Sequence, residues 1–291
     1  MYKLVAIDLD GTMLNSKGIV TDKTKRTIKK AIANGIEVII ASGRNINSIR
    51  TIANEAGINT YCISGNGASI YDLQKNKILY EKYLTKEEIL RTIKICRANQ
   101  IYCTLYTDDF ILAEKIHYNT LSYYSTNIRL PEEKRTRIAL VKDLYEYVVE
   151  NEEEKFLKIM ICEEDKEKFL KIIEELKGIE NITLLDMCHT HKKIILQDKI
   201  ERNLEYFYAE ILNKDSDKWN AIEYLIKELN IKKEEVIAIG DNSNDFKMLE
   251  NAGLGISLKG SNPKAIQKAD VVVADNNSDG VAEAIEKYVI K

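Results

Sequence analysis

Two aspartates, Asp8 and Asp10, follow a short apolar segment near the start of the chain. The apolar run Leu4–Ile7 predicts a strand that is buried on both faces, and a glycine and a threonine come directly after Asp10. Open α/β sheets carry their chemistry at this end of a strand. Two like charges at the end of a buried strand are unfavourable unless a cation joins them. A divalent metal would resolve this repulsion. For this motif taken alone an ordinary acidic turn remains the better interpretation, and only the other motifs of the chain reverse that preference.

A second motif, Ser42-Gly43-Arg44, follows another apolar segment. The hydroxyl and the neighbouring main-chain N–H groups can donate to an anion, and Arg44 adds a planar fork of donors. Taken alone, these three residues fit a simple turn. Their position at a predicted strand end makes an anion site the better interpretation.

A third motif lies near the C-terminus, where Asp241, Asn244 and Asp245 follow the apolar segment Val236–Ile239. Carboxylate and amide oxygens are ligands suited to a hard cation such as Mg²⁺. Lys218 opens a predicted helix just before that strand. A capped loop and a solvated lysine are the ordinary alternatives, but the common placement of these groups with the first two motifs favours one functional site.

Strand and helix patterns alternate in the first and last parts of the chain, and the short connections demand a parallel sheet with right-handed crossovers. The predicted fold class is therefore α/β, with a Rossmann-like core. We expect strands at 4–7, 36–41, 60–64, 236–239, 255–257 and 271–273, and helices at 22–34, 46–56, 217–230, 244–251, 263–268 and 279–290.

The middle of the chain has a different character. After a predicted hairpin at 70–80, we expect helices at 86–99, 142–152 and 164–177, and short strands at 102–106, 111–114, 156–162, 182–185, 194–197 and 207–212. This order indicates an α+β insertion with mainly antiparallel strands. We expect a discontinuous core domain of residues 1–82 and 211–291, and an inserted domain of residues 83–210.

The three strand-end motifs, with Lys218 between the second and the third, resemble in order the four motifs of the haloacid dehalogenase superfamily. The large insert between the second and third motifs looks like the cap of its Cof-type phosphatases. Two further segments match that subfamily, Ser64–Ala68 and Asp279–Ala282. The resemblance implies a Rossmann-like core with an α+β cap that selects the substrate.

The resemblance also implies roles for residues of this chain. Asp8 would attack phosphorus and become an aspartyl-phosphate, while Asp10 would protonate the leaving oxygen and then deprotonate water. Lys218 and Ser42 would hold the phosphoryl oxygens, together with Gly43, and Arg44 would be an extra substrate contact. The metal ligands would be the Asp8 carboxylate, the Asp10 main-chain carbonyl and Asp241, with Asp245 and Asn244 completing or supporting the shell. Asn244 would also bind the phosphate of the substrate.

Two local departures from the family pattern stand out. Trp219 follows the motif lysine where relatives commonly have glycine. Its ring could pack under the helix, in register with Ile222 and Ile226, or crowd the phosphate site; helical spacing favours packing. The segment Leu258–Ser261 replaces a shorter turn.

Composition narrows the class of protein and of partner. The 291 residues are 31% charged and carry a net charge of −3, which is typical of an ordinary soluble protein. This charge does not favour binding to the phosphates of a nucleic acid or to an anionic membrane. No apolar run approaches the about 20 residues of a membrane span. Five cysteines without a C-x-x-C pair fit a reducing compartment, so we expect a cytoplasmic protein with no obligate protein partner. We expect the segment Cys188–His191, with two of the three histidines, to be a polar loop rather than a transition-metal site.

The sequence thus predicts a Mg²⁺-dependent phosphatase that acts on small phosphate esters, sugar phosphates first. Two other functions remain open. A phosphomutase would use the same aspartyl-phosphate but transfer the group to a sugar, and a non-catalytic protein would bind a phosphorylated metabolite without turnover. Dinucleotide binding at Gly65–Ile70 and a calcium loop at Asp241–Ala252 are disfavoured, because each lacks a required residue of its motif.

Overall fold

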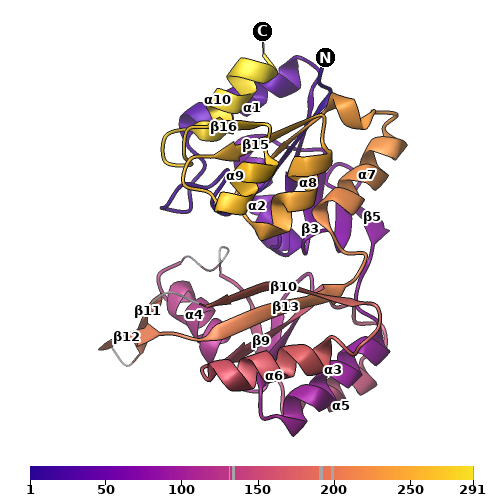
Figure 1. Cartoon of the computed structure of the whole chain (residues 1–291), viewed down its shortest axis with the longest axis vertical. Coiled ribbons are helices and arrows are strands. Elements are labelled where there is room, and N and C mark those ends of the chain that lie inside the picture. Colours follow the sequence, from indigo (N-terminus) through magenta and orange to yellow (C-terminus); the bar gives the residue numbers. More distant parts are fainter. Residues whose placement is uncertain (131, 133–134, 190–192, 198–199, 291) are drawn as a thin grey trace. The chain divides into compact units, whose positions relative to one another are not determined.

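The computed structural model describes residues 1–130, 132, 135–189, 193–197 and 200–290. The chain forms two compact units, Met1–Lys82 with Asp215–Lys291, and Tyr83–Lys214 (Figure 1). We call them the core unit and the inserted unit. The expected boundary after residue 210 falls too early, because strand β13 (Phe207–Asn213) stays paired along its length and the chain leaves the inserted unit only after it.

The core unit contains one eight-stranded sheet, in the order β16-β15-β14-β1-β2-β3-β4-β5. The strands from β16 to β3 are parallel, and the hairpin β4-β5 extends the sheet with antiparallel pairing. This confirms the predicted parallel α/β core. The strands are β1 (Leu4–Ile7), β2 (Glu37–Ala41), β3 (Tyr61–Ser64), β4 (Ser69–Asp72), β5 (Lys77–Glu81), β14 (Val236–Ile239), β15 (Leu254–Leu258) and β16 (Val271–Val273).

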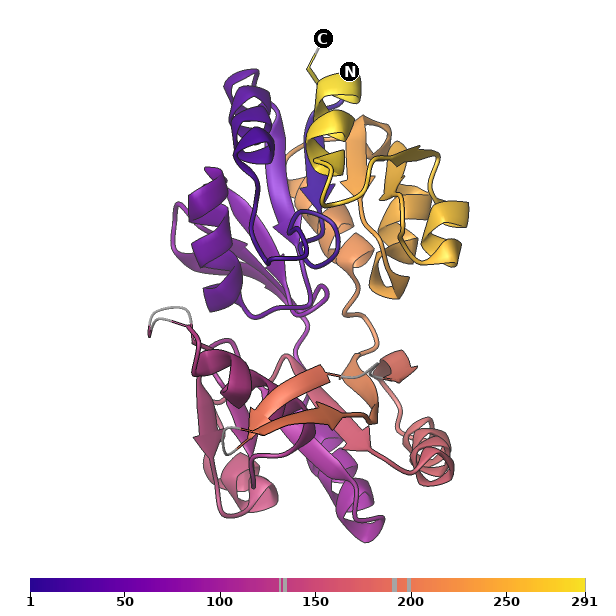
Figure 2. The same cartoon turned by 90° about the vertical axis from the view of Figure 1, so that its left-hand side faces the viewer.

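Helices cover both faces of this sheet. Alternate residues of β1 point to opposite sides, so that Val5 and Ile7 belong to one apolar cluster and Leu4 and Ala6 to another. The first cluster includes residues of α1, α2 and α10, and α1 and α10 lie side by side (Figures 1 and 2). The second includes residues of α7 and α8. The helices are α1 (Asp22–Ala33), α2 (Ile46–Ala56), α7 (Lys218–Glu228), α8 (Phe246–Asn251), α9 (Pro263–Lys268) and α10 (Gly280–Tyr288), with 3₁₀ turns η2 (Lys233–Glu235) and η3 (Ser243–Asp245).

The register of the parallel strands brings three of the motifs to one edge of the sheet. Ile7, the last residue of β1, lies opposite Ile239 of β14 and Ile40 of β2. The residues that follow each strand therefore emerge side by side. The main-chain N–H of Asp8 continues the ladder by donating to the carbonyl of Ile239 at 2.9 Å.

The inserted unit contains a six-stranded sheet in the order β10-β13-β9-β6-β7-β8, antiparallel except for the pair β7-β8. Residues of α3, α5 and α6 form an apolar cluster with one face of it. The predicted α+β character is confirmed. The elements are α3 (Lys86–Ala98), β6 (Tyr102–Tyr106), β7 (Ile111–Ala113), α4 (Tyr118–Asn127), β8 (Ile138–Leu140), α5 (Leu144–Glu150), β9 (Lys158–Glu163), α6 (Lys166–Leu176), β10 (Ile182–His189), β11 (Lys193–Gln197) and β12 (Ile200–Leu204), with β13 as above.

Three elements of the inserted unit were not expected from the sequence: α4, β8 and β12. The expected polar loop at Cys188–His191 is wrong in its first half, because Cys188 and His189 belong to strand β10 and pair with β13. Thr190 and His191 lie outside the described residues. The transition-metal alternative for this segment therefore rests on residues that the structure does not describe.

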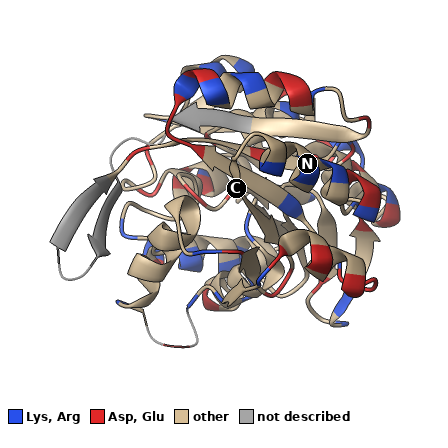
Figure 3. Ribbon diagram, turned by 90° about the horizontal axis from the view of Figure 1, so that it is seen from below, with Lys and Arg blue, Asp and Glu red and all other residues tan. Residues whose placement is uncertain are grey.

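Charged side chains of both signs are mixed along the helices (Figure 3). Within the described residues, the structure has no helix with the length and hydrophobicity that crossing a bilayer requires.

Candidate active site

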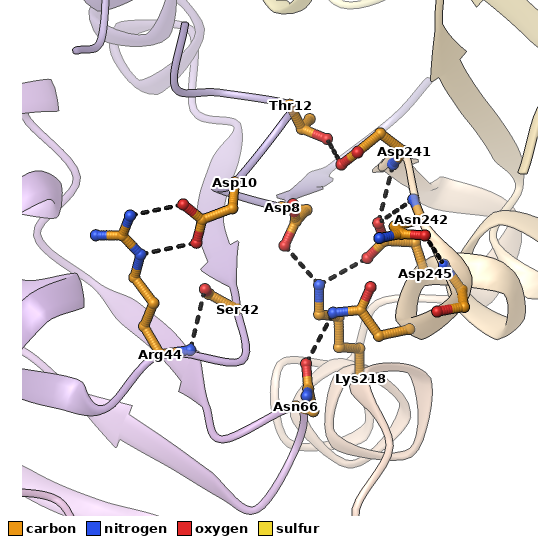
Figure 4. Close-up of polar contacts among 12 residues, drawn as sticks. Asp8, Asp10, Thr12, Ser42, Arg44, Asn66, Lys218, Asp241, Asn242 and Asp245 are labelled. Atoms are coloured by element: carbon orange, nitrogen blue, oxygen red, sulfur yellow. Dashed lines mark hydrogen bonds and ion pairs between the residues drawn. The ribbon is translucent and has the colours of Figure 1, made fainter. Parts of the chain in front are cut away.

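Three carboxylates, those of Asp8 and Asp245 buried and that of Asp241 half-buried, meet at the edge of the core sheet. Asp8 follows β1, while Asp241 and Asp245 belong to the loop and the 3₁₀ turn after β14, and oxygens of the three lie within 4.8 Å of one another. The loop is held in shape by Asp245, whose Oδ2 accepts hydrogen bonds from the main-chain N–H groups of Asp241 (2.9 Å) and Asn242 (3.1 Å) (Figure 4). We call Asp8, Asp241 and Asp245 the acidic cluster.

Lys218 supplies a positive charge inside the acidic cluster. Its Nζ donates to Oδ1 of Asp8 and to Oδ1 of Asp245, both at 2.6 Å, and the side chain is fully buried (Figure 4). Lys218 is the first residue of α7, and the carboxylate of Asp217 caps this helix by accepting from the main-chain N–H of Trp219 at 2.9 Å. The cap fixes the start of the helix and with it the position of the lysine.

The burial of these charges changes their pKa values. Burial raises the pKa of the Asp8 carboxyl well above its usual range, although Lys218 opposes the change. The nearby Asp245 and Asp241 add to the rise. Burial also raises the pKa of Asp241 to about 6, against the hydrogen bond from Thr12. Burial alone would lower the pKa of Lys218, but Asp245 and Asp8 outweigh it and raise that pKa.

Three carboxylates thus share one ammonium group, and two of them resist ionisation in this arrangement. A further cation would remove that resistance. The donors are all carboxylate oxygens, which suits a hard divalent ion such as Mg²⁺ better than a soft one. The residues present therefore fit the predicted metal.

The loop after β1 packs closely against Asp241. The Thr12 hydroxyl donates to Oδ1 of Asp241 at 2.7 Å. Gly11 has a φ of +86°, and a Cβ at this position would lie 2.4 Å from Oδ2 of Asp241. Only glycine fits here. Thr12 was not among the predicted site residues, although its place directly after the aspartate motif was a signal that could have found it.

Asp10 lies apart from the acidic cluster. Its two carboxylate oxygens accept hydrogen bonds from Nε and Nη2 of Arg44, at 2.7 and 2.6 Å (Figure 4). The arginine fork, rather than the acidic cluster, therefore holds the Asp10 carboxylate. The assignment of its main-chain carbonyl to the metal stays a prediction.

Ser42 and Gly43 form the turn that directly follows strand β2. Ser42 is buried, its N–H donates to the carbonyl of Ile63 at 3.0 Å, and its Oγ accepts from the N–H of Arg44 at 3.2 Å. A Cβ on Gly43 would lie 2.8 Å from the side-chain oxygen of Asn66. The turn is therefore packed against Asn66, a residue that lies outside the predicted site.

Asn66 links the second and third motifs. Its N–H donates to the carbonyl of Ser42 at 2.9 Å, and its Oδ1 accepts from Nδ2 of Asn244, also at 2.9 Å. The residue is buried and has a φ of +57°. The structure thus brings Asn244 to the site through Asn66, and the segment Ser64–Ala68 was the signal for it in the sequence.

Trp219 packs into the apolar core of the unit. Its side chain is 7% exposed and belongs to the cluster that contains Ile222 and Ile226. This confirms the packing interpretation over crowding of the phosphate site.

A family of haloacid dehalogenase-like hydrolases matches residues 5–285 of this chain. Phosphatase YwpJ of Bacillus subtilis (strain 168) is 27% identical over 299 residues, which cover 98% of this chain and 99% of that protein. The phosphatase YcsE of the same organism, named for 5-amino-6-(5-phospho-D-ribitylamino)uracil, is 26% identical over 290 residues. The match covers 99% of this chain and 96% of that protein.

A solved structure, that of a haloacid dehalogenase-like hydrolase from B. subtilis, is 26% identical to this chain and has a TM-score of 0.80. The match covers 98% of this chain and 99% of the other. The four motifs that were recognised in the sequence all lie within the residues that the family matches. The chain therefore belongs to the haloacid dehalogenase-like hydrolase family and is a phosphatase.

Proposed function

We propose that this phosphatase hydrolyses phosphate monoesters of small metabolites in a Mg²⁺-dependent reaction that passes through phosphorylated Asp8. The observation that carries the proposal is the buried contact between Lys218 and Asp8, 2.6 Å long, inside the acidic cluster. A carboxylate that is oriented by a buried ammonium group at a strand end has the arrangement of an activated nucleophile. Lys218 would also reduce repulsion between this carboxylate and the incoming phosphate.

In the first half of the proposed reaction, an oxygen of Asp8 forms a bond to phosphorus while the bond from phosphorus to the leaving oxygen breaks. Asp10 gives its proton to that oxygen. In the second half, water attacks phosphorus, Asp10 accepts the proton of the water, and the bond to Asp8 breaks. The products are an alcohol and inorganic phosphate, and both aspartates return to their starting forms.

The acidic cluster would hold the metal. Asp8, Asp241 and Asp245 are the ligands that the geometry supports, with the Asp10 carbonyl and Asn244 completing or supporting the shell. A bound Mg²⁺ would offset negative charge on the phosphoryl oxygens.

The phosphoryl oxygens would be bound by donors of the second motif and by Lys218. Ser42 offers its hydroxyl and Gly43 its main-chain N–H, and the packing of Asn66 against both motifs keeps this turn in place. A direct contact between Arg44 and the substrate stays a prediction.

The proposed substrates are compact phosphate esters, with sugar phosphates as the first choice. The relative named for a phosphorylated ribitylamino-uracil supports a small metabolite as substrate. All the groups assigned to the phosphoryl transfer belong to the core unit, which leaves the inserted unit to select the leaving group as a cap. Four described cysteines are free thiols, which supports the proposed cytoplasmic location.

The experiment is a screen of inorganic phosphate release from a library of small phosphate esters, with Mg²⁺ and with excess chelator. Wild type should release phosphate from at least one ester only with the metal, and Asp8→Asn should lose nearly all of this activity because an amide does not attack phosphorus. Asp22→Asn, in the first turn of α1, is the matched control and should behave as wild type.

Three outcomes would contradict the proposal. Transfer of the phosphoryl group to a second sugar without phosphate release would indicate a phosphomutase. Ester binding without turnover would indicate a sensor. Near-normal activity of a folded Asp8→Asn protein would exclude the aspartyl-phosphate mechanism.

A further inference from the structure

The pair formed by Asp10 and Arg44 is a two-point contact. Nε of Arg44 donates to Oδ2 of Asp10 at 2.7 Å, and Nη2 donates to Oδ1 at 2.6 Å (Figure 4). Two parallel bonds between a planar fork and a planar carboxylate fix both the position and the rotation of the carboxylate. The contact therefore selects one orientation of Asp10.

The guanidinium is itself held in place from the opposite side. Nη1 of Arg44 donates to the hydroxyl of Ser48 at 3.2 Å, in the first turn of α2. The main-chain N–H of Arg44 donates to Oγ of Ser42 at 3.2 Å. Arg44 thus connects Asp10 to a rigid helix and to the turn that is proposed to bind the phosphoryl group.

The exposure of the pair argues against a role in holding the fold together. The Arg44 side chain is 35% exposed and that of Asp10 is 59% exposed. Ion pairs in such positions contribute little to stability because water and salt screen them. What the two-point contact provides at this position is orientation.

The contact leaves part of the Asp10 carboxylate open to other partners. A carboxylate has about four lone-pair sites, of which the fork takes two. The remaining sites can accept a hydrogen bond from water. The contact therefore leaves Asp10 accessible to the water of the second half of the proposed reaction.

We infer that Arg44 is a positioning residue that holds Asp10 in the orientation in which it accepts the proton of the attacking water, and that it thereby speeds hydrolysis of phosphorylated Asp8. This inference rests on the proposed function. In this role Arg44 acts through Asp10. Its removal should therefore slow a step in which Asp10 takes part and spare a step that does not need Asp10.

The test is a rapid-mixing experiment with 2,4-dinitrophenyl phosphate, an ester whose leaving group departs without a proton donor. The first half of the reaction then does not need Asp10 and appears as a burst of dinitrophenolate, while the steady state reports hydrolysis of phosphorylated Asp8. For Arg44→Gln we expect a burst rate within about threefold of wild type and a steady-state rate lower by about 10- to 100-fold. Phosphorylated protein should accumulate to nearly one equivalent.

Two companion variants separate orientation from charge. Arg44→Lys keeps the positive charge but cannot donate two parallel hydrogen bonds to the carboxylate oxygens of Asp10. We therefore expect it to recover only a small part of the lost steady-state rate. In an Asp10→Asn background, Arg44→Gln should cause no further loss, because the residue that it positions is already absent. Arg50→Gln, in the neighbouring helix α2, is the matched control; its guanidinium lies over the ring of Tyr71, 4.9 Å from the centroid, and we expect wild-type kinetics.

The inference is overturned if burst and steady-state rates fall together in Arg44→Gln, which would make Arg44 a substrate contact. It is equally overturned if the steady-state rate does not change, if Arg44→Lys recovers it fully, or if the losses of Arg44→Gln and Asp10→Asn multiply. Mg²⁺ titration by calorimetry checks that the variants remain folded, and an unchanged affinity is expected. A wild-type protein with no burst and no phosphate release from any ester of the screen would instead refute the proposed function, and the inference with it.

Discussion

Each unit of the molecule buries an ammonium group against carboxylates, but the numbers of charges differ. In the core unit, Lys218 lies 2.6 Å from both Asp8 and Asp245, and Asp241 adds a third carboxylate to the cluster. In the inserted unit, Lys158 of β9 pairs with Glu210 of β13. Buried charges are stable when they are paired.

The difference separates a functional arrangement from a structural one. The charges of Lys158 and Glu210 offset each other, and the ring of Tyr106 lies under the Lys158 ammonium, with its centroid at 5.0 Å. Three carboxylates around one ammonium leave negative charge that a bound cation would neutralise. Experiments that add or remove single charges in the two units can test this contrast.

The largest effect is expected from Lys218→Met. The variant leaves the acidic cluster without its ammonium group, so that repulsion of the phosphate rises and Asp8 loses its orienting contact. We expect kcat to fall by about 10³-fold or more. Lys227→Met removes an exposed lysine from the same helix, where it lies 3.6 Å from Glu223, and should not change kcat. A Lys218→Met protein that folds and keeps more than a tenth of wild-type kcat would contradict this role.

The next effect concerns the pair of Lys158 and Glu210. Lys158→Met removes the ammonium group that offsets the charge of the buried Glu210 carboxylate, and we expect the free energy of unfolding to fall by about 3–5 kcal/mol. The double variant Lys158→Met/Glu210→Leu removes both charges and should recover most of that loss. Urea unfolding measures both values. A double variant as unstable as the single one would show that the pair is more than a structural contact.

Metal binding should stabilise the protein through the core unit alone. At a Mg²⁺ concentration of 100 times the Kd, we expect the free energy of unfolding of wild type to rise by about 2.7 kcal/mol. Asp241→Asn removes a ligand and should lose most of this gain, whereas Lys158→Met should keep it. Thermal unfolding with and without Mg²⁺ gives the comparison, and an equal gain in Asp241→Asn would place the ion elsewhere.

The smallest effect is expected at an exposed pair of the inserted unit. Arg97 donates to Asp143 at 2.7 Å and lowers the pKa of that carboxyl. A lowered pKa stabilises the fold above the ordinary pKa of aspartate and ceases to do so as the pH falls through the lowered value. Arg97→Gln should therefore cost less than about 1 kcal/mol at pH 7, and the difference from wild type should vanish in acid. A pH-independent difference would rule out the ion pair as its cause.

Short-range patterns explain which parts of the active site could be predicted from the sequence. The apolar run Leu4–Ile7 and the aspartate directly after it specify a buried strand and a strand-end carboxylate without any knowledge of distant residues. The same holds for Trp219, whose helical spacing with Ile222 predicted its place in the core. These features depend on neighbours within a few positions in the chain.

Features that depend on distant partners were missed. The carboxylate of Asp10 is turned toward Arg44, which is 34 residues away in sequence, and no local pattern gives the direction of a side chain after a strand ends. Asn66 bonds to Asn244, 178 residues further along the chain. Such contacts exist only once the sheet has brought the strand ends together.

The inserted unit shows the same limit at the level of whole elements. Helix α4 (Tyr118–Asn127) consists largely of Tyr, Ser, Thr and Asn, which are weak helix formers. Its sequence therefore does not predict a helix. Strand β8 has only three residues and exists through its pairing with β7. Long-range packing overrides local preference in both cases.

The central claim is that Asp8 carries the phosphoryl group. A single turnover with an ester from the phosphate-release screen can be quenched in acid and reduced with borohydride, which converts an aspartyl-phosphate to homoserine. Peptide mass spectrometry then identifies the residue. We predict homoserine at position 8 in the wild type, only when both ester and Mg²⁺ are present, and none in Asp8→Asn. Phosphate release by the wild type with no modified residue, or with the modification at another aspartate, would contradict the account.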